Sequence, residues 1–150
     1  MKSPILILTT NDLTAGPMAA SYLAAKLKEL NDTVHEIHSA GLQARRENSV
    51  GTGARTVLEE KGIPLLHIGS TQLDYKELRA ADLVLCLNQE TRKTLAAKYH
   101  FEGPKAILLM SLADSTEPIL EPKSGSVEAN RACLEKMIPA LDILAQRIAQ

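Results

Sequence analysis

The sequence is poor in aromatic and thiol side chains and has no excess of charge of either sign. Its 150 residues include no tryptophan, one phenylalanine, three tyrosines and two cysteines, and the formal net charge is -1. A charge this close to zero gives no general electrostatic reason to expect a nucleic acid or a membrane surface as a partner. Cys86 and Cys133 match no metal-ligand spacing, so we expect both to be small buried apolar residues, with no metal and no cofactor.

The sequence also lacks a long apolar run. Only four apolar residues, 5–8, follow Met1-Lys2-Ser3-Pro4 before the polar Thr9. This is too short for a signal peptide or a membrane span, and we expect a cytoplasmic protein. The chain contains no repeat, low-complexity tract or linker, and 45% of its residues are hydrophobic against 23% charged. This composition is typical of a single globular domain over residues 1–150.

Short apolar runs alternate with helical patterns along the chain. The runs at 5–9, 83–87 and 106–110, with a weaker one at 34–38, predict strands buried on both faces. Helices are predicted from Pro17, with Gly16 as the cap, then before Gly62, at 74–82, at 88–98 and at 133–148, where Pro139 should cause a kink or break. This order predicts a parallel α/β sheet covered by helices on both faces. Ligands of such sheets bind at the carboxyl ends of the strands, which points to the loop after Thr9.

Several short motifs give this pattern a closer resemblance. They are Pro17-Met18-Ala19 after the first loop, "HSAG" at 38–41, "VLEEKGI" at 57–63, "STQL" at 70–73 and "AADLVLCLNQET" at 80–91. In this order and spacing, the chain resembles the low-molecular-weight protein tyrosine phosphatase family over nearly its whole length. The resemblance implies a three-layer flavodoxin-like sandwich of the phosphotyrosine protein phosphatase I type, with a four-stranded parallel sheet.

The resemblance also implies a reaction whose two main groups are missing here. In the family, a cysteine at the end of the first strand attacks phosphorus, and an arginine six positions later binds the phosphate oxygens. Counting back from Pro17, these positions hold Thr9 and Ala15, and a threonine hydroxyl is a poor nucleophile without a base. We therefore expect a pseudophosphatase. The whole degenerate anion loop consists of Thr9, Thr10, Asn11, Asp12, Leu13, Thr14, Ala15 and Gly16.

Asp12 replaces an asparagine of the family loop and has two interpretations. An ionised carboxylate here would repel a phosphate, so we expect weak phosphate binding. The same side chain could instead have a structural role, bonding across to the serine of "HSAG", Ser39. The short hydroxyl side chains of Thr9, Thr10 and Thr14 are interpreted as partners of backbone groups in a tight turn.

The family's general acid is an aspartate followed by proline, and in this sequence a glutamate replaces that aspartate. Glu121-Pro122 matches its position, with Glu117-Pro118 as an alternative register. We place Ser39, Arg45, Arg46 and Lys123 at the rim of the site, where the cations could attract an anion, although a solvated surface role is the ordinary one.

Three functions remain open on the sequence alone. The first is a catalytically inactive relative that binds an anionic small molecule, a phosphoprotein or another protein at the loop face. The second is an enzyme with weak or altered phosphatase or hydrolase chemistry that uses Thr14, Asp12 or Glu121. The third is a role in assembly, which no residue positively supports.

Overall fold

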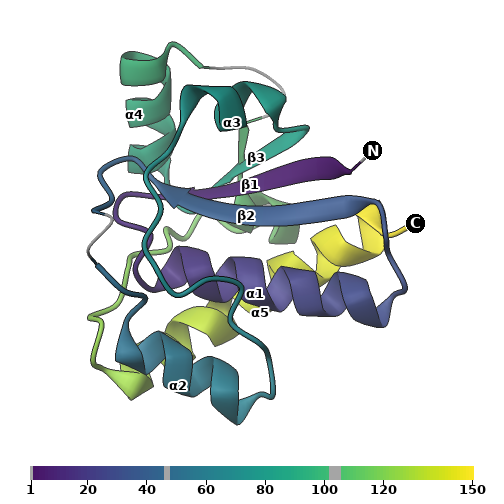
Figure 1. Cartoon of the computed structure of the whole chain (residues 1–150), viewed down its shortest axis with the longest axis vertical. Helices are drawn as coiled ribbons and strands as arrows, with labels where there is room; N and C mark the ends of the chain where they lie inside the picture. The colour runs from purple at the N-terminus through teal and green to yellow at the C-terminus, as the bar shows by residue number, and fades with distance from the viewer. Residues whose placement is uncertain (1, 46–47, 102–105) are drawn as a thin grey trace.

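One parallel sheet organises the fold. Figure 1 shows the computed structural model of the chain, which describes residues 2–45, 48–101 and 106–150. The strands are β1 (Ser3–Thr9), β2 (His35–Gly41), β3 (Leu83–Cys86) and β4 (Ala106–Leu108). They lie in the order β2-β1-β3-β4, and every pairing is parallel. The predicted four-stranded parallel sheet is confirmed.

Helices cover both faces of this sheet. The helices α1 (Ala15–Glu29), α2 (Thr52–Glu60) and α5 (Val127–Ile148) lie on one face, and α3 (Tyr75–Ala80) and α4 (Gln89–Tyr99) lie on the other (Figure 1). The molecule is therefore the three-layer α/β sandwich that the resemblance implied. No helix in the described part of the chain is long and apolar enough to cross a membrane.

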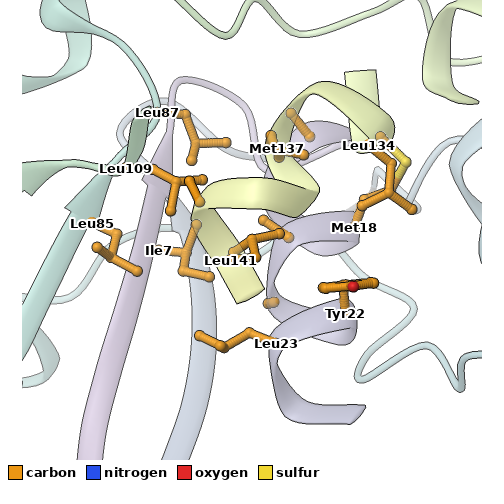
Figure 2. Packing of buried hydrophobic residues seen from close by; sticks show 14 of the residues in the cluster. Ile7, Met18, Tyr22, Leu23, Leu85, Leu87, Leu109, Leu134, Met137 and Leu141 are labelled. Atoms are coloured by element: carbon orange, nitrogen blue, oxygen red, sulfur yellow. The ribbon is translucent and has the colours of Figure 1, made fainter. Parts of the chain in front are cut away.

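The central strand β1 is apolar throughout because it contributes to two cores. Ile5 and Ile7 belong to the cluster that contains α1, α2 and α5, whereas Leu6 and Leu8 belong to the cluster with α3 and α4. Successive side chains of a strand point to opposite faces, so a strand covered on both faces has no polar positions. Figure 2 shows the first cluster, in which Met18 and Leu23 of α1 and Leu134, Met137 and Leu141 of α5 belong to one core with Ile7 and Leu85.

Two sequence predictions about element ends were wrong, and α5 does not break at Pro139. Gly16 does not cap α1, because the helix begins at Ala15 with Thr14 as its N-cap, and Pro17 lies in the first turn. The expected strand at 106–110 ends at Leu108, where a 3-10 helix, η1 (Leu109–Ala113), begins. The helix α5 continues through Pro139, which is exposed. The fully buried Met137 and Leu141 on either side of that proline hold α5 against the core despite the lost hydrogen bond.

The two cysteines are free and buried, as the sequence predicted. Cys86 belongs to the cluster under α3 and α4, and Cys133 to the cluster on the opposite face of the sheet. Burial raises the pKa of Cys86 to about 12 and that of Cys133 to about 11. Both thiols therefore remain protonated at neutral pH and act as small apolar side chains.

Candidate functional site

Hydrogen bonds to its backbone carbonyl groups fix the loop between β1 and α1 in place. Neighbouring segments donate to four of them: Leu42 N to Thr9 O at 3.0 Å, Gln43 N to Thr10 O at 2.7 Å, Gly51 N to Leu13 O at 2.8 Å, and Ser70 Oγ to Asn11 O at 2.6 Å. The C=O and N–H of a trans peptide point in opposite directions. The N–H groups that follow these carbonyls are therefore turned away from the supporting segments, which is the arrangement of an anion-binding loop.

A carboxylate from the distant acid segment accepts hydrogen bonds from two backbone amides of the loop. Glu121 Oε1 accepts hydrogen bonds from Leu13 N at 3.3 Å and from Thr14 N at 3.2 Å. Thr14 Oγ1 also donates to Pro122 O at 3.2 Å, which holds the backbone of the segment against the loop. Glu121 thus interacts with the loop as an anionic ligand would.

The two possible registers of the acid segment are now distinguished. Glu121 contacts the loop, whereas Glu117 is an exposed residue paired with Lys136 at 2.7 Å. The hydrogen bond and the charge of Lys136 lower the pKa of Glu117. Glu121 therefore takes the position that the sequence assigned to the acid loop.

Asp12 has the structural role that the sequence left open. Its φ of 54° is in the left-handed region, and its side chain is 0% exposed. Asp12 Oδ2 accepts a hydrogen bond from Thr71 N at 2.9 Å, so the carboxyl joins the loop to the segment that follows α2. Asp12 is thus buried and bonded to Thr71, and the carboxylate that accepts the amides of Leu13 and Thr14 is that of Glu121.

Because it is buried, the carboxyl of Asp12 keeps its proton to a higher pH than a solvated aspartate does. Desolvation raises its pKa from 3.8 to about 6, and the charge of Glu121 acts in the same direction. Hydrogen bonding from Ser39 and Thr71 and the charge of His67 lower the pKa but do not offset the burial. Asp12 Oδ1 has no hydrogen-bond partner in the described structure and lies 3.2 Å from where a Cβ on Gly16 would be.

His67 is a member of this site that the sequence did not indicate. Its Nε2 lies 2.9 Å from Ser39 Oγ, and its Nδ1 lies 2.8 Å from Gly69 O. A carbonyl can only accept, so Nδ1 carries a proton; Nε2 then accepts from Ser39 Oγ when the ring is neutral and donates to it when the ring is protonated. No spacing signal could have found His67, because the irregular segment after α2 must first fold back over the end of β2.

Thr9 and Ala15 occupy the positions that the resemblance gave them. Thr9 is the last residue of β1, Ala15 is the first residue of α1, and both are buried. Thr9 Oγ1 accepts a hydrogen bond from Asp12 N at 2.9 Å, which closes a turn inside the loop. Thr9 thus supports the backbone, as expected for a short hydroxyl side chain.

The rim predicted from the sequence is only partly described. Arg45 and Lys123 are exposed, and neither forms an ion pair within the described residues. Ser39 is not a rim residue, since it is 2% exposed beneath the loop. Arg46 lies outside the described residues. Among those residues no group of His, Cys, Asp and Glu could hold a metal ion.

Comparison with known proteins agrees with this geometry. The family model "Low molecular weight phosphotyrosine protein phosphatase" matches residues 4–150. The chain is 28% identical over 145 residues to a protein-arginine-phosphatase of Geobacillus stearothermophilus, and the match covers 96% of this chain and 95% of that protein.

Solved structures share the fold of this chain. The YwlE arginine phosphatase from Geobacillus stearothermophilus superimposes with a TM-score of 0.84 at 26% identity, covering 97% of this chain and 92% of that one. A YwlE mutant from Bacillus subtilis gives a TM-score of 0.88 at 23% identity, covering 98% and 99%. From its fold, its loop and the match over residues 4–150, the chain belongs to the low molecular weight phosphotyrosine protein phosphatase family.

Proposed function

We propose that this chain has lost the phosphatase reaction of its family and acts by binding, as a pseudophosphatase. The observation that carries the proposal is the identity of the two residues at the ends of the loop. Thr9 supplies a hydroxyl that is already an acceptor for Asp12 N, and Ala15 supplies a methyl group where a guanidinium would bind phosphate oxygens. Neither residue can form a thiolate or a bidentate phosphate contact.

The ligand in this proposal binds at the loop face. The frame that presents amides is retained, with β1 before it, the N-terminus of α1 after it and the carbonyls held from outside. The exposed Arg45 and Lys123 add positive charge at residues that the sequence assigned to the rim. An anionic small molecule or an acidic or phosphorylated segment of a partner protein would suit these groups.

Altered enzymatic chemistry is the second candidate. One structural neighbour is described as a YwlE arginine phosphatase mutant with a phosphorylated active site serine. In that protein a hydroxyl carries a phosphoryl group, so a threonine at the corresponding loop position could do so in principle. In this chain no described histidine is bonded to Thr9, and Thr9 Oγ1 accepts from Asp12 N, so no base is in place to activate it.

Turnover assays test the proposal. We expect no hydrolysis of p-nitrophenyl phosphate or of phosphoarginine above the buffer rate. Thr9→Cys alone should not restore turnover, because Ala15 leaves the phosphate without its main cationic contact. The protein-arginine-phosphatase of Geobacillus stearothermophilus serves as the positive control, and Thr10→Cys is the matched thiol control. Robust turnover by the unmodified chain would show that it is an enzyme and that the proposal is wrong.

A further inference from the structure

The structure places an acceptor of the chain's own in the anion loop. Glu121 Oε1 receives the amides of Leu13 and Thr14, whereas the loop's own carbonyls are engaged with other segments. The amides at the start of α1, Ala15 and Gly16, have no acceptor among the described residues. The loop thus keeps donors for an anion and devotes two of them to one carboxylate.

The bonds to Glu121 are long. At 3.2 and 3.3 Å they lie beyond the usual 2.7–2.9 Å of hydrogen bonds to a charged acceptor. The side chain is only partly buried, so water reaches the carboxylate. These features describe a contact that is formed in the resting chain and can be exchanged for another anion.

The backbone on both sides of Glu121 is fixed independently of its carboxyl group. Ile119 N donates to Leu87 O at 3.2 Å, and Asn88 Nδ2 donates to Ile119 O at 2.9 Å. Pro122 O accepts from Thr14 Oγ1. The carboxylate can therefore leave the loop by rotation of its side chain alone.

We propose that Glu121 is an internal ligand of the anion loop, and that an external anion binds only by displacing it. This inference rests on the proposed binding function, because it concerns the same loop. A site that its own chain occupies for most of the time has an apparent affinity reduced by the fraction of time for which it is open. The charge of Glu121 also opposes a second anion until the side chain has moved away.

The test compares two glutamates of one segment that are both followed by proline. Inorganic phosphate is titrated into the full chain, Glu121→Ala and Glu117→Ala by calorimetry, and the backbone amide resonances of Leu13 and Thr14 are followed by NMR. We expect Glu121→Ala to lower the apparent Kd for phosphate by about tenfold or more and to make both amides respond to phosphate. Glu117→Ala removes an exposed charge of the same segment and should behave like the unmodified chain.

A second variant tests whether the effect of Glu121→Ala comes from a local change of structure. Glu121→Gln keeps the length of the side chain and removes its charge, and we expect an apparent Kd between those of the unmodified chain and Glu121→Ala. The inference is wrong if all four proteins bind phosphate equally, or if Glu117→Ala gains as much as Glu121→Ala. These outcomes are separate from the turnover assay: hydrolysis by the unmodified chain refutes the proposed function, whereas unchanged phosphate binding in Glu121→Ala refutes the internal ligand.

Discussion

Asp12→Asn is expected to stabilise the protein, and more strongly at neutral than at acid pH. The carboxyl has a pKa of about 6 in the folded chain against 3.8 in the absence of burial, so folding favours its protonated form. The folded state therefore binds more protons than the unfolded state between these two values, and stability falls as the pH rises through this range. Integrated over the pKa shift, the buried carboxyl of Asp12 lowers the free energy of unfolding by about 3 kcal/mol at about pH 7.5 and by about 1 kcal/mol at about pH 4.5.

An asparagine at position 12 has no charge to bury and can keep the hydrogen bond from Thr71 N. Its amide oxygen can accept from Thr71 N as Asp12 Oδ2 does, and a neutral amide avoids burying a charge where Oδ1 has no partner. Asparagine also tolerates the φ of 54°. Urea unfolding at the two pH values measures the difference.

Asp114→Asn is the matched control for this change. Asp114 has the same φ of 54° but is exposed, and we expect its replacement to alter stability by less than about 0.5 kcal/mol at either pH. An equal gain for Asp12→Asn at both pH values would show that Asp12 is not a buried acid with a raised pKa.

Gly41→Ala is expected to lower the free energy of unfolding by about 3 kcal/mol and to displace the loop. Gly41 is the last residue of β2, and a Cβ built there would lie 2.7 Å from Thr10 O and 2.9 Å from Asn11 C. These are backbone atoms of the loop, so no side-chain rotation can relieve the contact. Either the loop or the end of β2 must move.

Urea unfolding and the amide spectrum of the loop measure both effects. The matched control is Gly69→Ala, because no atom lies within 4 Å of a Cβ at that position. We expect this control to change stability by no more than about 0.5 kcal/mol and to leave the loop amides in place. Wild-type stability in Gly41→Ala would show that the loop does not pack on the end of β2 as closely as described.

The sheet could be predicted from the sequence because its signal is local. The runs around Ile7 and Leu85 are apolar without alternation, which only a strand covered on both faces requires. The end of α2 was equally clear, since Gly62 has a φ of 68° and directly follows the C-cap Lys61. The continuity of α5 through Pro139 was not predictable, because it depends on how firmly distant segments pack against Met137 and Leu141.

The loop could be predicted from the sequence only in part. Its frame, and the positions where the resemblance implies a cysteine and an arginine, could be located by counting residues from Pro17. The roles of its two carboxylates could not, because which of them meets the amides depends on tertiary contacts. Asp12 bonds to Thr71, 59 residues away, and Glu121 bonds to Leu13, 108 residues away.

That last separation has a consequence for how the protein is made. The amides of Leu13 and Thr14 leave the ribosome near the beginning of synthesis, and their carboxylate partner belongs to the last quarter of the chain. Contacts of such long sequence separation form late, since most of the chain must already be in place. In a growing chain the loop therefore has no internal carboxylate to bind. The contact between Glu121 and the loop is completed only when the segment before α5 has been synthesised and has docked.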